Sequence, residues 1–100
     1  MNDPIGFLLA DAARLYRRAL DDRARTLGVT SQQWRALALI SRRPGSHQGM
    51  VADILEMEPI TVSRMIDRLQ EAGLIERRAD PNDRRAWRLY LTDAAQPVIQ

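Results

Sequence analysis

The chain has 100 residues, with 15 basic and 13 acidic side chains and a formal net charge of +2. This length is typical of one domain and allows a sizeable buried core. The absence of cysteine excludes disulfides, cysteine zinc sites and thiol redox sensors, and no apolar run is long enough to cross a bilayer. Because the N-terminus lacks a basic, apolar leader, we expect a cytoplasmic protein. All 15 basic residues are arginine, whose planar guanidinium suits phosphates and guanine edges.

Residues 4–27 predict one long helix. Pro4 suits a first turn, apolar side chains recur at steps of three and four, and Gly28 is the expected C-cap. The apolar surface of this helix is wider than one stripe. Because a helix that is apolar on more than one side usually contacts more than its own domain, we expect half of it in the core and half in a subunit interface.

Three shorter helices are predicted to follow. Residues 30–33 (Thr-Ser-Gln-Gln) have the pattern of a capping box and open a helix that runs to about Arg42, before Pro44-Gly45. The polar residues 46–49 could include a short strand, and the next helix covers about residues 49–55. Glu56-Met57-Glu58 is then a turn, and Pro59 is the expected first residue of the fourth helix.

The fourth helix divides its residues between two faces. Val62, Met65, Ile66 and Leu69 follow helical spacing and predict a buried face. The outward side carries small polar residues and arginines, which suit contact with DNA, and a helix N-terminus attracts phosphate. These outward residues are Thr61, Ser63, Arg64, Asp67 and Arg68. The alternative is a solvated face with ordinary ion pairs, Arg64 with Asp67 and Arg68 with Glu71.

A basic hairpin is predicted after this helix. Residues 74–78 and 86–91 alternate as two strands, residues 80–83 (Asp-Pro-Asn-Asp) are strong turn formers, and Thr92-Asp93 is expected to cap a last helix. An arginine at a projecting tip can enter a narrow minor groove, and Asp83 could hold the Arg85 side chain in position. A charged hairpin that only protects its own edges explains the abundance of arginine less well. The arginines are Arg77, Arg78, Arg84, Arg85 and Arg88.

These elements predict a mainly α fold with a small antiparallel β-hairpin, which is a winged helix-turn-helix. The chain resembles the MarR family of bacterial transcription regulators, and most of all its SlyA-type branch. The resemblance covers essentially the whole chain in order. It rests on the segments GVTSQQWRALALI (28–40), TVSRMIDRLQEAGLIER (61–77), DPNDRR (80–85), Leu91-Thr92 and AQPVI (95–99).

The resemblance implies a sequence-specific DNA-binding regulator, such as a repressor, that acts as a homodimer on palindromic operators and needs no cofactor. Residues 1–29 would belong to the dimerisation region, 30–91 to the DNA-binding domain, and 92–100 to the start of a truncated C-terminal helix. The implied DNA contacts lie on the fourth helix and on the hairpin. Thr61, Ser63 and Arg64 would contact the major groove or its phosphates, with Arg68 on the same face. Arg85 with Arg84 would enter the minor groove, oriented by Asp83, and Arg77 would be structural or phosphate-facing at the hairpin base.

The resemblance also implies a ligand, because many members of the family release DNA on binding aromatic carboxylates or phenols such as salicylate. The cleft lies between the dimerisation helices and the winged helix. Arg14, Tyr16 and Trp34 could line it, although a core role for Trp34 is at least as consistent with the sequence.

Two departures from the family pattern affect these expectations. Glu56 stands where the turn of the family usually has glycine. Either Glu56 is left-handed, which costs a non-glycine residue up to about 1–2 kcal/mol, or the turn has a different geometry. The long C-terminal helices, which form most of the family's dimer interface, are absent after Gln100. The chain is therefore expected to be a fragment or a natural truncation, and pairing of the first helix alone could be too small to sustain a dimer.

Other functional classes fit less well. His47 is the single histidine and lies in a Gly/Ser-rich connection rather than beside an ordered acid, and no lysine is present to complete a phosphate-binding loop, so we expect no enzyme. Asp53, Glu56 and Glu58 lack a glycine-rich loop, so we expect no metal site. A winged-helix module that binds protein instead of DNA remains the alternative, because fold does not fix function.

Overall fold

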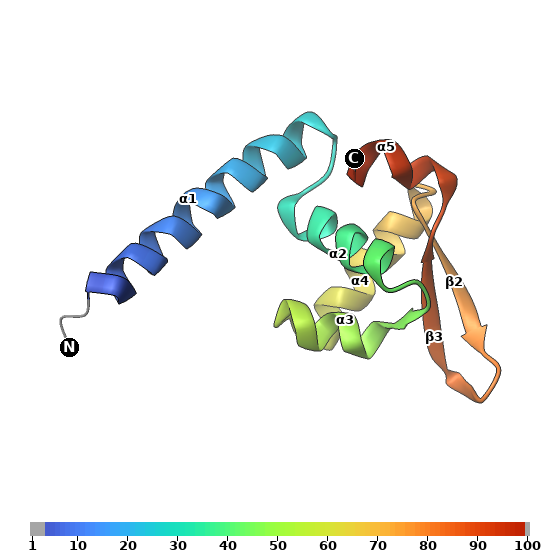
Figure 1. The fold of residues 1–100 in the computed structure, drawn as a ribbon. Coiled ribbons are helices and arrows are strands. Elements are labelled where there is room, and N and C mark those ends of the chain that lie inside the picture. The colour runs from blue at the N-terminus through green and yellow to red at the C-terminus, as the bar shows by residue number, and fades with distance from the viewer. Residues whose placement is uncertain (1–3, 100) are drawn as a thin grey trace. The chain divides into compact units, whose positions relative to one another are not determined.

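The computed structural model describes residues 4–99, except for the side chain of Arg84. The chain divides into two compact units, Met1–Ser31 and Gln32–Gln100. Helix α1 (Pro4–Thr26) forms the first unit (Figure 1). No helix in residues 4–99 combines the length and the apolar character that crossing a bilayer requires. The other elements, in chain order, are α2 (Ser31–Arg42), β1 (Ser46–His47), α3 (Gln48–Leu55), α4 (Pro59–Glu71), β2 (Ile75–Asp80), β3 (Asp83–Leu91), η1 (Asp93–Ala95) and α5 (Gln96–Ile99).

Helix α1 ends where the sequence predicts. Gly28 adopts a left-handed φ of +78°, and the Val29 N–H donates to the Ala24 carbonyl at 3.0 Å. Leu20 and Ala24 are buried, whereas six large apolar side chains nearer the N-terminus are more than half exposed. This part of α1 therefore carries an exposed apolar surface. The exposed residues are Ile5, Phe7, Leu8, Leu9, Leu15 and Tyr16.

The core of the second unit is built by one face of each helix and by the sheet. The face predicted for α4 is confirmed, because Val62, Met65, Ile66 and Leu69 are all buried, and Pro59 is the first residue of α4 as expected. A Gly73 φ of +78° and a bond from the Leu74 N–H to the Leu69 carbonyl (2.9 Å) end α4 and turn the chain into β2. The other core residues are Ala36, Leu37, Ile40, Val51, Ala52, Leu55, Ile75, Leu89 and Ala95.

The sheet has three strands in the order β1-β3-β2, all antiparallel, and the β2–β3 hairpin extends away from the helices of its own unit (Figure 1). The short strand expected in residues 46–49 is present as β1. Both hairpin strands reach closer to the turn than the predicted 74–78 and 86–91, because Asp80 pairs with Asp83 across a turn of only Pro81 and Asn82. We call residues 75–91 the wing.

The segment after the wing folds back onto the same unit. Thr92 is the N-cap residue of η1, as expected, but its hydroxyl makes no cap bond and donates instead to the Gly73 carbonyl at 2.5 Å. The Thr92 N–H donates to the Leu74 carbonyl at 3.1 Å, and Ala95 is fully buried. These contacts attach η1 and α5 to the end of α4 and the start of β2.

The turn between α3 and α4 contains a left-handed Glu56, at φ 54° and ψ 46°. The Met57 N–H donates to the Ala52 carbonyl at 3.0 Å, which closes α3 with the geometry that glycine normally supplies. The departure noted in the sequence is therefore real in the structure. A glutamate carries the strain of a conformation in which Cβ approaches the following carbonyl oxygen.

We predict that Glu56→Gly raises the free energy of unfolding. Relief of roughly 1–2 kcal/mol of left-handed strain is partly offset by the greater freedom of glycine in the unfolded chain, which leaves a gain of roughly 0.5–1 kcal/mol. Urea denaturation measures the change. Glu58→Gly is the matched control, because Glu58 has an ordinary φ of −63° and the same substitution relieves no left-handed strain there. Equal changes in the free energy of unfolding of Glu56→Gly and Glu58→Gly would contradict the assignment of strain.

Candidate nucleic-acid interface

The outward face of α4 is open and cationic. Thr61, Arg64 and Arg68 are exposed and Ser63 is half-buried. Neither arginine has an ion pair within residues 4–99, so the pairs with Asp67 and Glu71 that would make this an ordinary solvated face are not formed there. Although Pro59 itself has no N–H, the amides that follow it in the first turn of a helix are free donors, and they lie at the positive end of the helix dipole. The first turn of α4 can therefore receive a phosphate, with Arg64 one turn further along.

Arg77 lies at the base of the wing, with only 17% of its side chain exposed. Its guanidinium donates to Asp67 Oδ1 at 2.5 Å, to Gln70 Oε1 at 3.2 Å and to the Ser63 carbonyl at 3.3 Å, all on α4. It also donates to Gln48 Oε1 on α3 at 3.3 Å, while its buried Nε has no partner among the described residues. Of the two roles expected for Arg77, the structural one matches these contacts, because few donors remain for a phosphate.

Two further wing arginines are engaged by partners within the sheet. Arg78 pairs with Glu76 at 3.2 Å and stacks over the Tyr90 ring at 4.1 Å, and Glu76 raises the pKa of the Arg78 guanidinium. Arg88 donates its Nε to Asp80 Oδ2 at 3.2 Å. The five arginines of the predicted basic tip are therefore not equivalent.

Arg85, near the tip of the wing, differs from Arg78 and Arg88. Arg85 is exposed and has no ion pair within the described chain. Its N–H donates to Asp83 Oδ1 at 3.0 Å, so Asp83 holds the backbone at Arg85 rather than the guanidinium that the sequence suggested. Arg84 lies in β3, but its side chain is outside the described part of the structure.

One cluster of polar side chains, around Asp80, was not predicted from the sequence. His47 was expected to have no ordered acid beside it, yet its Nε2 lies 2.7 Å from Asp80 Oδ2. Asp80 was expected to be a simple turn residue, yet it is only 6% exposed. Its pKa is lowered to about 2, first by the hydrogen bond from the Asn82 N–H and then by His47, with a further contribution from Arg88. No local pattern signals this contact, because 33 residues separate the two partners.

The residues proposed to line a ligand cleft belong to both units. Arg14 and Tyr16 are on α1; Arg14 pairs with Asp11 at 3.5 Å, and Tyr16 is 65% exposed. In the second unit, the partly buried Trp34 donates its indole N–H to the Val98 carbonyl at 3.2 Å. This bond ties α2 to α5 and matches the core role that the sequence left open for Trp34.

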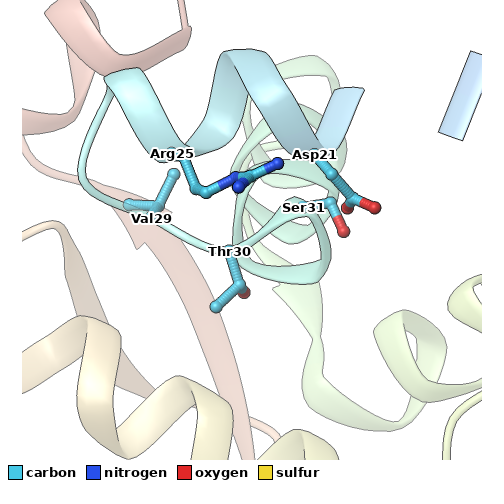
Figure 2. Close-up of a pocket in the computed structure, with 5 residues that line it drawn as sticks. All are labelled: Asp21, Arg25, Val29, Thr30 and Ser31. Carbon is cyan, nitrogen blue, oxygen red and sulfur yellow. The ribbon is translucent and has the colours of Figure 1, made fainter. Parts of the chain in front are cut away.

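The first unit contains an open hollow of about 370 Å³ at the end of α1. Figure 2 shows the Arg25 side chain extending toward Asp21, with Val29 and Thr30 on the connection that follows α1 and Ser31 at the start of the next helix. Arg25 also pairs with Asp22 at 2.5 Å. None of the three residues expected to line a ligand cleft borders this hollow. Within residues 4–99, no group of three or more histidine or acidic side chains is placed to hold a metal ion.

Comparison with known proteins gives one family throughout. The sequence model of the MarR family matches residues 27–86. A MarR family transcription regulator of solved structure is 31% identical, with a TM-score of 0.81 over 90% of this chain. Wild-type MarR from E. coli in its apo form is 25% identical, with a TM-score of 0.91 over 99% of this chain. A MarR mutant from E. coli complexed with operator DNA is 26% identical, with a TM-score of 0.81 over 96% of this chain.

The coverage of these solved proteins is smaller in the other direction. This chain spans 60% of the length of the first structure, 73% of the apo MarR and 69% of the MarR in complex with operator DNA. The match therefore includes nearly all of the present chain and only part of each relative.

We predict that Asp80 makes stability depend on acid pH. Since its folded pKa is depressed to about 2, its contribution is present above the ordinary value of 3.8 and is lost as pH falls toward 2. Asp80→Asn should therefore lower the denaturation midpoint near neutral pH, and the gap to wild type should narrow as pH falls from about 4 to about 2. Denaturant titrations at several pH values measure this gap. A gap that stays constant across this range would show that the ionised carboxylate is not responsible.

Proposed function

We propose that this chain, which belongs to the MarR family of transcription regulators and not to a family of enzymes, is a sequence-specific DNA-binding regulator. In this proposal α4 enters the major groove and the tip of the wing reaches the adjacent minor groove. The observation that carries it is the distribution of arginine over α4 and the wing. Arg64 and Arg68 on α4 and Arg85 at the tip are exposed without ion-pair partners in the described chain, whereas Arg77, Arg78 and Arg88 have internal partners.

The two proposed contact surfaces have different chemical roles. On α4, Thr61 and Ser63 offer hydroxyls and Arg64 offers a bidentate donor for guanine, so this helix would read base edges in the major groove. At the wing tip, Arg85, with Arg84 beside it in sequence, would enter a narrow A·T-rich minor groove, where the negative potential is strongest. Asp83 supports this role by fixing the Arg85 backbone. Arg68 would add a phosphate contact.

Arg85→Ala should lose roughly 1–3 kcal/mol of operator binding and reduce the salt slope by about 1. The matched control is Arg78→Ala, which removes the same charge from the same hairpin but from a guanidinium already engaged by Glu76 and Tyr90. Anisotropy titrations of a labelled duplex, selected from a random pool, at several salt concentrations measure both variants. Equal losses would contradict the minor-groove assignment. For wild type, affinity that does not change with salt would favour a protein-binding winged helix instead.

We further propose that two copies associate through α1 on a palindromic operator, as its exposed apolar residues support. Sedimentation equilibrium should then give a mass that rises with concentration from 11.4 kDa toward twice that value. Leu8→Glu should suppress the rise, since it places a charge within the apolar surface, while Arg17→Glu is a control for added negative charge. A wild-type mass of 11.4 kDa at every concentration would contradict association through α1.

Release by a small aromatic acid rests on the family alone. In this chain Trp34 donates its indole N–H to Val98, and Arg14 already faces Asp11. We therefore assign Trp34 to the packing of α2 against α5.

A further inference from the structure

The carboxylate of Asp80 joins three segments of the second unit. Its Oδ2 lies 2.7 Å from His47 Nε2 in β1 and 3.2 Å from Arg88 Nε in β3, and its Oδ1 accepts the Asn82 N–H of the turn at 2.8 Å. Only 6% of Asp80 is exposed. We call the contact among His47, Asp80 and Arg88 the clasp.

The register of the sheet explains why an acid is needed at this position. His47 lies opposite Arg88 in the β1–β3 ladder, and Arg88 lies opposite Arg78 in the β2–β3 ladder. Directly opposed like charges destabilise a sheet. Glu76 and Tyr90 engage Arg78, which leaves Asp80 as the acid paired with both Arg88 and His47. The clasp therefore places a carboxylate beside Arg88, which lies opposite the like-charged Arg78.

The contacts of Asp80 with Arg88 and with His47 have different consequences. Arg88 belongs to the same hairpin as Asp80, so their contact holds the wing to itself. His47 lies outside the hairpin and directly precedes α3, which begins at Gln48. The β1–β3 ladder has only two residue pairs, Ser46 with Leu89 and His47 with Arg88. The His47–Asp80 bond is therefore a side-chain link, near the tip, from the wing to the helix-turn-helix.

We propose that His47 is a positioning residue for DNA binding, and that it acts through Asp80 to fix the tip of the wing relative to α3 and α4. The path from His47 to the tip is short. Asp80 pairs with Asp83 across the turn, and Asp83 holds the N–H of Arg85. Loss of the imidazole frees the hairpin to swing and leaves the tip arginine without a fixed place at the minor groove. This inference rests on the proposed DNA-binding function.

The first measurement uses the free protein and needs no DNA. Hydrogen exchange should be faster at the amides of residues 82–86 in His47→Ala than in wild type, with exchange in the buried part of α4 unchanged. His47→Gln should preserve slow exchange, because its amide can still donate to Asp80. Unchanged exchange at the tip of His47→Ala would overturn the clasp even if the protein binds DNA.

The second measurement is a double-mutant cycle with Arg85→Ala on a bound duplex. His47→Ala should weaken binding about three- to tenfold in the wild-type background and have little effect when Arg85 is already alanine. A general structural role would instead give the same factor in both backgrounds, and that result would overturn positioning through Arg85. His47→Gln should recover most of the affinity. If wild type bound no duplex at low salt, the proposed function would fail, and the exchange measurement would still decide whether the clasp orders the tip.

Discussion

The geometry of the second unit depends on the contacts of the guanidinium of Arg77, whose side chain is only 17% exposed. Arg77 donates to Gln48 of α3, to Ser63, Asp67 and Gln70 of α4, and it belongs to β2. An arginine with little exposure is costly unless oxygen atoms surround it, and here two helices supply them. Since α4 and the wing bear the two proposed DNA-contacting surfaces, this one side chain links them. Because Asp67 pairs with Arg77, it does not pair with Arg64, which has no ion pair among the described residues.

Some arginines of α4 and the wing make ion pairs within the second unit, whereas others are exposed and make none among the described residues. A net charge of +2 on 100 residues gives little long-range attraction for DNA, so the local distribution matters more than the total. Acids at Asp67, Glu76 and Asp80 engage the guanidiniums at the base and middle of the wing. Among the described side chains of α4 and the wing, the arginines left without an ion pair are Arg64, Arg68 and Arg85. Basic composition alone would have assigned every wing arginine to DNA, and the pairing within the sheet corrects this.

Much of the fold follows from local patterns in the sequence. The buried face of α4 and its start at Pro59 could be predicted, because each depends on residues within one or two turns of chain. The left-handed conformation of Glu56 was suggested only by the glycine that the family usually has there. The contacts that could not be predicted join distant segments. His47 and Asp80 are 33 residues apart. Asp67 pairs with Arg77, which lies beyond the turn after α4, rather than with Arg64 on its own helix. Helical spacing permits the Arg64–Asp67 pair, but a nearly buried Arg77 gains more from the carboxylate than an exposed Arg64 does.

The wing is therefore held at both ends, by Arg77 at its base and by Asp80 near its tip. This arrangement bears on affinity, because ordering a hairpin during binding costs free energy that a preordered hairpin has already lost. Two-stranded hairpins are only marginally stable by themselves. Anchoring to α3 and α4 at the base and to β1 near the tip removes that motion before DNA arrives. What remains to be ordered is the Arg85 side chain, whose backbone Asp83 already fixes. In the proposed function, the acids of this basic wing would favour DNA binding by restricting the free protein, although their own charge would oppose it.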